Sequence, residues 1–162
     1  MTKRIIVVED SMTFCERICN MLKRQGWETS KAYNMHKGME LVQEADEFTI
    51  VLSDLRLPDG DGIKLLEWMR NNGYENKFVI MTDYESFSSA VAAIKKGAAN
   101  YFPKSQMQGD LFPFLDALWK GNEHIAKSRE KIFARTSEAF TKVTEMVNMF
   151  APIQITVMIL GE

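Results

Sequence analysis

One stretch of the sequence decides the fold: Val51-Leu52-Ser53-Asp54, a short apolar run that ends on a carboxylate, followed directly by Leu55-Arg56-Leu57-Pro58-Asp59-Gly60-Asp61-Gly62. An apolar run of this length, bounded by proline and glycine, predicts a buried strand. Asp54 should therefore lie where that strand leaves the sheet, which is the edge at which open α/β sheets bind ligands. A single aspartate in a loop is common, so its meaning depends on the residues at the ends of the other apolar runs.

The other apolar runs repeat this pattern along the chain. Strands are predicted over residues 5–8, 27–33, 48–53, 78–81 and 98–102, each followed by a helical pattern. Strands that alternate regularly with helices are typical of an α/β fold. We therefore predict a doubly wound, five-stranded parallel sheet in the order 2-1-3-4-5, with helices on both faces.

The predicted helices have recognisable ends and faces. Asn34 and Asp61 are suitable caps for the second and third helices, and Gly97 ends the fourth. The fourth helix carries its apolar residues at helical spacing, at Phe87, Ala90, Val91 and Ile94. In the first helix, Cys15 and Cys19 lie one turn apart on the apolar face, and with no histidine clustered nearby they predict small buried hydrophobes.

Composition limits the classes of function. The chain has 162 residues, 46% hydrophobic and 26% charged, which is typical of a globular protein. Its net charge of −2 provides no general basic surface for nucleic acid, so we expect no direct nucleic-acid contact. The apolar run after the N-terminal basic residues is too short for a signal peptide, and no run is long enough to span a membrane. A cytoplasmic protein is expected.

Polar side chains come directly after four of the five predicted strands. Glu9 and Asp10 come after the first strand, Asp54 after the third, Thr82 after the fourth and Lys104 after the fifth. These four strands are adjacent in the predicted order, and the second strand, at the edge, adds no such residue. We therefore expect the side chains to meet in one crevice at the carboxyl edge of the sheet.

The chemistry of this set points to a phosphoryl group and a hard cation. Three carboxylates in one crevice repel one another unless a cation compensates. Mg²⁺ suits a site that has few carboxylates, keeps waters and accepts a phosphate oxygen. Lys104 is able to neutralise a phosphoryl oxygen or to pair with Asp54, and Thr82 offers a hydroxyl. A nucleophile, a Lewis acid, a lysine and a hydroxyl are what a covalent acyl phosphate requires.

Each of these residues also has a simpler explanation on its own. Glu9 and Asp10 are able to cap the first helix, Thr82 is able to cap the fourth, and Lys104 can be a surface lysine. The prediction therefore depends on their joint occurrence at the ends of adjacent strands.

The C-terminal part has a different pattern. A last helix is predicted to start near Gln106, with a coiled-coil-like seam at Leu111, Leu115, Leu118, Ile125 and Ile132. Gly121 is expected to interrupt this helix, and a long solvated helix with one apolar stripe is the alternative. Residues 155–160 are almost wholly apolar and read as a strand whose sheet this sequence does not supply.

Residues 3 to about 120 resemble a receiver domain of a two-component response regulator. The matching strings are Ile5-Ile6-Val7-Val8-Glu9-Asp10, Asp54 with Leu57-Pro58-Asp59-Gly60-Asp61-Gly62, Met81-Thr82, and Gly97-Ala98-Ala99-Asn100-Tyr101-Phe102-Pro103-Lys104. The resemblance implies a signalling protein rather than an enzyme.

The resemblance also implies roles for individual residues. Asp54 would accept a phosphoryl group from a sensor histidine kinase, and Thr82 and Tyr101 would move together in response. Mg²⁺ would be held by Asp10, Asp54 and the backbone carbonyl of Arg56, with Glu9 acting through water. One departure stands out: Ser105 follows Lys104, where receivers usually have proline, so we expect a differently shaped or more mobile loop.

Residues 140–162 carry a second resemblance, to the opening of the AAA+ ATPase domain of nitrogen-regulator-type, sigma-54-dependent activators. There a strand ending in Gly-Glu enters the Walker A loop, whose later glycine and lysine this sequence lacks, so it cannot cradle a nucleotide. The implied organisation is a receiver domain over 1–120, a linker helix over 121–136 that continues the last receiver helix, and a truncated N-terminal fragment of the ATPase domain over 137–162. A homodimer through the last helix and linker is implied with it.

Two rival functions stay open at this point. A phosphatase that uses an aspartyl phosphate would need a second positioned acid-base group, and Arg56 and Tyr84 are poor candidates for it. A degenerate receiver that acts as a phosphorylation-independent adaptor is the other, with the Lys104-Ser105 loop as its reason.

Overall fold

The computed structural model describes residues 2–83 and 86–133. The chain divides into two compact units, Met1–Asn122 and Glu123–Glu162. The first unit contains the whole sheet and all the residues of the predicted site. Of the second unit, the described residues are those at the end of the last helix.

The sheet has the predicted topology. Its five parallel strands are β1 (Lys3–Val8), β2 (Trp27–Ala32), β3 (Ile50–Asp54), β6 (Phe78–Thr82) and β7 (Asn100–Pro103), in the order β2-β1-β3-β6-β7. This order is the predicted 2-1-3-4-5. The three central strands are almost wholly buried because helices cover both faces, which explains their continuous apolar runs.

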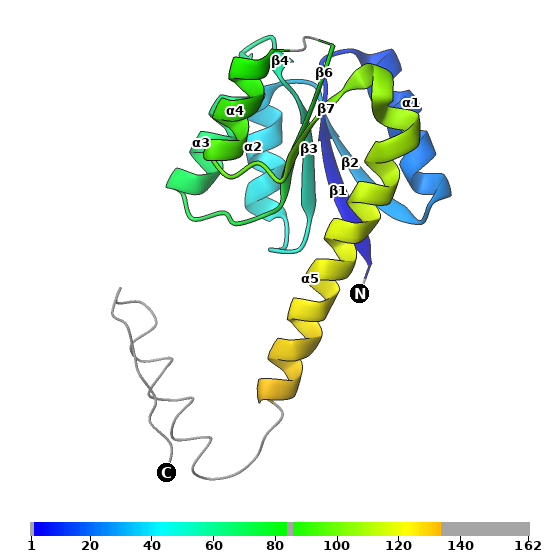
Figure 1. The fold of residues 1–162 in the computed structure, drawn as a ribbon, viewed down its shortest axis with the longest axis vertical. Helices are drawn as coiled ribbons and strands as arrows, with labels where there is room; N and C mark the ends of the chain where they lie inside the picture. Colours follow the sequence, from blue (N-terminus) through cyan, green and yellow to red (C-terminus); the bar gives the residue numbers. More distant parts are fainter. Residues whose placement is uncertain (1, 84–85, 134–162) are drawn as a thin grey trace. The chain divides into compact units, whose positions relative to one another are not determined.

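Five α-helices follow the strands: α1 (Met12–Arg24), α2 (Met35–Glu44), α3 (Gly62–Asn71), α4 (Phe87–Lys95) and α5 (Phe112–Phe133). Figure 1 shows α1 and the start of α5 on one face of the sheet and α2, α3 and α4 on the other. The predicted caps are confirmed, because the Asn34 side chain accepts from Lys37 N and the Asp61 side chain from Lys64 N. Gly97 has a φ of 97°, as a glycine that ends a helix requires.

Two hydrophobic cores hold the sheet between these helices. On the α1 and α5 side, Ile18, Leu22 and Leu115 pack against Ile5 and Leu52. Cys15 and Cys19 are free thiols with no exposed surface in this core, which confirms the prediction that they are buried hydrophobes. The second core joins the other face of the sheet to α2, α3 and α4.

A two-stranded hairpin between β3 and α3 was not predicted. Its strands are β4 (Arg56–Leu57) and β5 (Gly60–Asp61), paired antiparallel with Arg56 opposite Asp61. Strands of two residues are too short to show an alternating pattern, so no periodic signal marks them in the sequence.

Helix α4 buries less of its apolar face than its pattern indicates. Phe87 is 88% exposed and Ile94 is 49% exposed, whereas the buried residue of this helix is Ala93. The stripe at Phe87, Ala90, Val91 and Ile94 therefore does not form the core contact of the helix. The small side chain of Ala93 lets the helix approach the sheet instead.

The predictions for the last helix need three corrections. Regular α-helix begins at Phe112, after a 3-10 turn (Lys104–Gln106) and a π-helical turn (Met107–Leu111), rather than near Gln106. It runs through Gly121 without interruption, since one glycine in a helix costs only about 1 kcal/mol. Leu111 and Leu115 are fully buried in the domain's own core, so the start of the seam is not a contact with a second chain.

Asn122 marks the point where α5 stops packing on the domain. It is buried, and its side-chain amide donates to the Phe48 carbonyl at 3.1 Å, which ties α5 to the loop before β3. Beyond it, Ile125 is 47% exposed. The side chain of Ile132 and residues 137–162, with the predicted apolar strand, lie outside what the structure describes.

Candidate phosphoacceptor site

The carboxyl ends of four adjacent strands bring the predicted residues together. Asp54 is the last residue of β3 and Thr82 the last of β6, while Lys104 directly follows β7. Glu9 and Asp10 directly follow β1. The parallel register places these strand ends at the same edge of the sheet, where these side chains are expected to meet.

Lys104 is the electrostatic centre of the site. Its Nζ lies 2.7 Å from Glu9 Oε2, 2.9 Å from Asp54 Oδ2 and 3.7 Å from Asp83 Oδ2. The side chains of Lys104, Glu9 and Asp54 are all less than a tenth exposed, so these ion pairs form with little screening by water. Asp83 directly follows Thr82 and was not among the predicted site residues; its side chain is 70% exposed.

Burial and ion pairing shift the pKa values of Glu9 and Lys104 in opposite directions. Burial raises the pKa of Glu9, and the hydrogen bond and charge of Lys104 only partly offset that rise. For Lys104, burial by itself lowers the pKa, but Glu9 and Asp54 outweigh it and leave the pKa above its usual value. Lys104 is therefore a fixed positive charge at neutral pH.

The two carboxylate oxygens of Asp54 have different surroundings. Its Oδ2 accepts from Lys104, whereas its Oδ1 is buried and has no hydrogen-bond partner among the described residues. A buried carboxylate oxygen without a partner is costly, and such atoms in native structures point to a function or a bound ion. Oδ1 is therefore the atom of this site from which a reaction or an ion contact is expected.

The surrounding carboxylates fit a hard cation. Glu9, Asp10 and Asp54 each offer one oxygen, and the three oxygens lie within 4.8 Å of one another. Asp10 is exposed, whereas the other two are buried, so the group is open to solvent on one side. An oxygen-only set with few carboxylates and access for water is the set that Mg²⁺ prefers.

The backbone around Asp54 is held closely by the start of α3. A Cβ on Gly62 would lie 2.4 Å from the Asp54 carbonyl oxygen, and the Gly62 amide donates to the Leu55 carbonyl at 2.8 Å. The Ser53 hydroxyl donates to the Asp54 carbonyl at 2.9 Å. Glycine at 62 is therefore required by close approach, which fixes the strand exit that carries Asp54.

Thr82 and Tyr101 lie on neighbouring strands. Thr82 is fully buried at the end of β6, opposite Pro103, and Tyr101 is half-buried on β7, opposite Ile80. Tyr101 packs against the core on the α2, α3 and α4 side. The two residues are thus placed on strands that pair directly, one beside the site and one next to the α4 layer.

The loop after β7 is the one for which Ser105 predicts a different shape or greater mobility. Lys104 begins a short 3-10 turn, and every peptide bond between described residues is trans. The Lys104 ammonium lies 4.5 Å from the centre of the Phe14 ring, a cation–π contact from the first turn of α1. Phe14 also packs against the core on the α1 and α5 side, and no spacing in the sequence connects it with Lys104.

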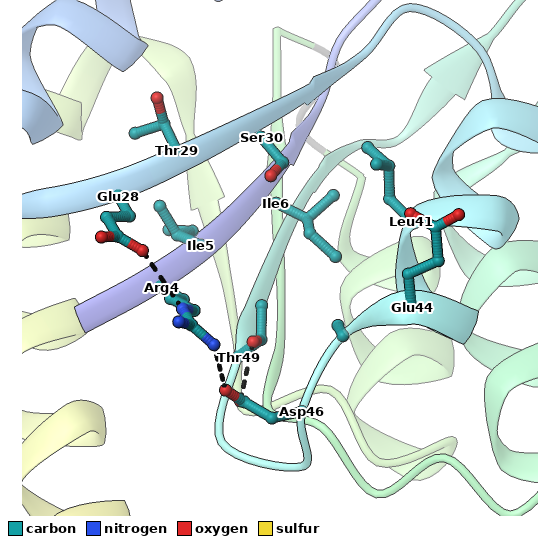
Figure 2. A pocket seen from close by; sticks show the side chains of 11 residues that line it. Arg4, Ile5, Ile6, Glu28, Thr29, Ser30, Leu41, Glu44, Asp46 and Thr49 are labelled. Atoms are coloured by element: carbon teal, nitrogen blue, oxygen red, sulfur yellow. Dashed lines mark hydrogen bonds and ion pairs between the residues drawn. The ribbon is translucent and has the colours of Figure 1, made fainter. Parts of the chain in front are cut away.

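A separate hollow of about 400 Å³ lies at the opposite end of the strands, near the start of β1 and β2. Figure 2 shows Arg4 reaching across it to Glu28 and Asp46, with which it forms ion pairs at 3.2 and 2.9 Å. Three carboxylates line this hollow, and two of them, Glu28 and Asp46, already pair with Arg4. The carboxylates around Asp54 differ, because three of their oxygens lie within 4.8 Å of one another.

Solved structures share this architecture. The chain superposes on a two-component response regulator of the LuxR family from Aurantimonas sp. SI85-9A1 with a TM-score of 0.68 and 26% identity, covering 80% of this chain and 99% of that one. A CheY-like receiver domain protein from Methanospirillum hungatei JF-1 gives a TM-score of 0.65 at 26% identity, over 75% and 99% of the two chains. The fold is that of a flavodoxin-like receiver.

The family is established by the sequence match. The model of the response regulator receiver domain matches residues 5–115, and the chain belongs to this family. Residues 5–115 are therefore a response regulator receiver domain of a two-component system.

Two curated relatives show how much of a longer protein the chain covers. The photosynthetic apparatus regulatory protein RegA of Rhodobacter capsulatus is 31% identical over 110 residues, 67% of this chain and 59% of RegA. The transcriptional regulatory protein ZraR of Klebsiella oxytoca is 29% identical over 164 residues, 98% of this chain and 37% of ZraR. Within the described residues, no helix combines the length and apolar character needed to cross a membrane.

Proposed function

We propose that Asp54 is the phosphoacceptor of a cytoplasmic signalling switch. The carrying observation is that its Oδ1 is buried without a partner among the described residues while its Oδ2 is held by Lys104 at 2.9 Å. A carboxylate oxygen attacks the phosphorus of a phosphohistidine or a small acyl phosphate, a P–O bond to Asp54 forms, and the bond to the donor breaks with its electron pair leaving on the donor. The product is an acyl phosphate on Asp54.

Lys104 holds the charge that this reaction creates. Its ammonium already faces Asp54 in a buried setting, so it can pair with a phosphoryl oxygen without a large movement. The raised pKa keeps it protonated throughout. The proposed role of Thr82 is to donate its hydroxyl to another phosphoryl oxygen from the end of the neighbouring strand.

The residues that would hold Mg²⁺ are Asp10, Asp54 and the backbone carbonyl of Arg56, with Glu9 acting through water. The three carboxylates fit this role because their oxygens lie within 4.8 Å of one another. When bound, Mg²⁺ supplies positive charge to the transferring phosphoryl group. Glu9 keeps its contact with Lys104 and orients it toward Asp54.

The switch would act through Thr82 and Tyr101. Recruitment of the Thr82 hydroxyl toward the phosphoryl group changes the packing next to Tyr101, two positions earlier along the paired strand. A local change in charge thereby shifts the equilibrium between conformations of the surface that α4, β7 and α5 form. The exposed Phe87 and Ile94 on α4 are apolar groups that such a shift is able to cover or expose.

The proposed output is a homodimer that regulates a transcription-activating ATPase. The alignment with ZraR extends over 98% of this chain, beyond the receiver domain. A solved relative is described as a beryllofluoride-activated NtrC4 receiver domain dimer. We assign residues 121–136 to the linker helix and 137–162 to the beginning of the ATPase domain, with dimer contacts through α5 and the linker. The chain itself turns over no substrate beyond slow self-dephosphorylation.

The test is the intact mass of the chain after incubation with acetyl phosphate and MgCl₂, with Asp54→Asn as control and sedimentation run in parallel. One phosphoryl adduct on the wild type and none on the variant is expected. If no adduct forms at any of the Mg²⁺ concentrations tested, the phosphoacceptor function is overturned and the phosphorylation-independent adaptor is favoured. A sedimentation coefficient that does not respond to the adduct would overturn the proposed dimer control only.

A further inference from the structure

The tip of the β4–β5 hairpin is bound to the start of helix α2. Asp59, in the turn of this hairpin, accepts the Met35 amide at 2.7 Å through Oδ1 and the His36 amide at 2.9 Å through Oδ2. The carboxylate is therefore bidentate to a helix that lies more than twenty residues away in the sequence. Burial by itself raises the pKa of Asp59, but the backbone amides of His36, Met35 and Asp59 itself, together with the charge of His36, outweigh it and leave the pKa below its usual value.

These bonds complete the cap of α2. The amides of the first turn of a helix have no partner inside the helix. Asn34 Oδ1 accepts the Lys37 amide at 2.7 Å, and Asp59 accepts the two amides before it. Since α2 has no acidic residue in its own first turn, Asp59 also supplies the negative charge that the helix dipole favours there.

The hairpin is fixed at further points along its length. A Cβ on Gly60 would lie 2.6 Å from Met35 Sδ, so the turn packs directly on α2. Leu57 is buried in the core beside α3. At the other end, Asp61 caps α3 through the Lys64 amide at 2.7 Å. The hairpin thus connects the first turns of two helices.

Arg56 lies on this hairpin, two residues after Asp54 and paired with Asp61. The proposed metal site uses the backbone carbonyl of Arg56, and a backbone ligand is only as well placed as the segment that carries it. A loose loop would have to be ordered each time a cation binds, which lowers affinity. A hairpin anchored at its tip removes that cost.

We infer that Asp59 is a positioning residue for the metal site: by binding the Met35 and His36 amides it holds the Arg56 carbonyl in place and couples cation binding to the start of α2. This inference rests on the proposed function, since it assumes that Arg56 is a ligand. Outer groups that orient metal ligands typically contribute 10–100-fold in affinity. Coupling is reciprocal, so bound Mg²⁺ should also stabilise the contact between Asp59 and α2.

The experiment measures Mg²⁺ dissociation constants by calorimetric titration with MgCl₂ on the whole chain, for wild type, Asp59→Ala and Asp59→Asn. We expect about a tenfold weaker Mg²⁺ affinity in Asp59→Ala, and a smaller loss in Asp59→Asn, whose amide keeps one acceptor oxygen. Hydrogen exchange of the Met35 and His36 amides is the second readout. Mg²⁺ should slow it in the wild type and leave it unchanged in Asp59→Ala.

The matched control is Asn34→Ala, which removes the other cap of the same helix and leaves the hairpin contact in place. Its Mg²⁺ affinity should stay within about twofold of the wild type. Equal losses in Asn34→Ala and Asp59→Ala would reduce Asp59 to a helix cap and overturn the inference. If the wild type binds Mg²⁺ and Asp59→Ala binds it with the same affinity, the inference is also overturned. A wild type that does not bind Mg²⁺ at millimolar concentration would overturn the proposed function, and the inference with it.

Discussion

Lys104→Met removes the ammonium group that faces Glu9, Asp54 and Asp83 and keeps a side chain of similar length. Two of the three carboxylates are buried, with side chains no more than 9% exposed, at 2.7 and 2.9 Å from Nζ. Removing one partner of a buried ion pair costs about 3–5 kcal/mol, because the remaining charges stay desolvated. The variant should therefore lose about this much free energy of unfolding at neutral pH without Mg²⁺.

The assay is urea unfolding of wild type and variant in EDTA and again in MgCl₂. With a urea m-value of about 2 kcal/mol/M, the midpoint in EDTA should fall by about 1.5–2.5 M. Mg²⁺ at a hundred times its dissociation constant adds about 2.7 kcal/mol, so the cation should restore much of the loss. Because the pKa of Lys104 is raised, the wild type keeps this stabilisation at neutral pH and loses it as the pH rises through that pKa.

Equal midpoints for wild type and Lys104→Met in EDTA would refute this reasoning. They would mean that the ion pairs seen around Lys104 contribute no net free energy to the fold. A midpoint that falls but does not respond to Mg²⁺ would refute the second half, that the cation and the lysine neutralise the same carboxylates.

Three further predictions concern residues around Asp54. Because burial raises the pKa of Glu9, protons should compete with Mg²⁺ at a higher pH than they would for an ordinary glutamate. Mg²⁺ titrations at falling pH should show this loss of Mg²⁺ affinity, and Glu9→Gln should not show it. Gly62→Ala should destabilise the domain by about 1–3 kcal/mol in urea unfolding, because its Cβ would meet the Asp54 carbonyl, whereas Gly121→Ala, with open space around it, should be neutral or stabilising. Phe14→Leu should lower the Lys104 pKa measured by NMR and cost about 0.5–2 kcal/mol, and Phe14→Tyr should preserve both values.

The sheet and most of the site could be predicted because they depend on local signals. Apolar runs of strand length fixed β1, β3 and β6, and their parallel order then placed Asp54, Thr82 and Lys104 at one edge. The caps Asn34 and Asp61 lie directly beside the amides they bind, so they were visible in the sequence.

The features that were missed depend on contacts between distant segments. Asp59 caps a helix that begins 24 residues before it, and no spacing rule connects them. Leu111 and Leu115 repeat at coiled-coil spacing, yet that spacing is the same whether the partner is another chain or the domain's own sheet. The helical spacing of Phe87 and Ile94 on α4 likewise does not show that both side chains are exposed.

The central claim is that the phosphoryl group is carried by Asp54 and by no other carboxylate of the crevice. The most direct measurement is borohydride reduction of the chain after incubation with acetyl phosphate and MgCl₂, followed by peptide mass spectrometry, since reduction converts a phosphorylated aspartate to homoserine. Homoserine at position 54 alone is the predicted result. Reduction at Asp10 or Asp83, or no reduced residue in a chain that binds Mg²⁺, would contradict the account.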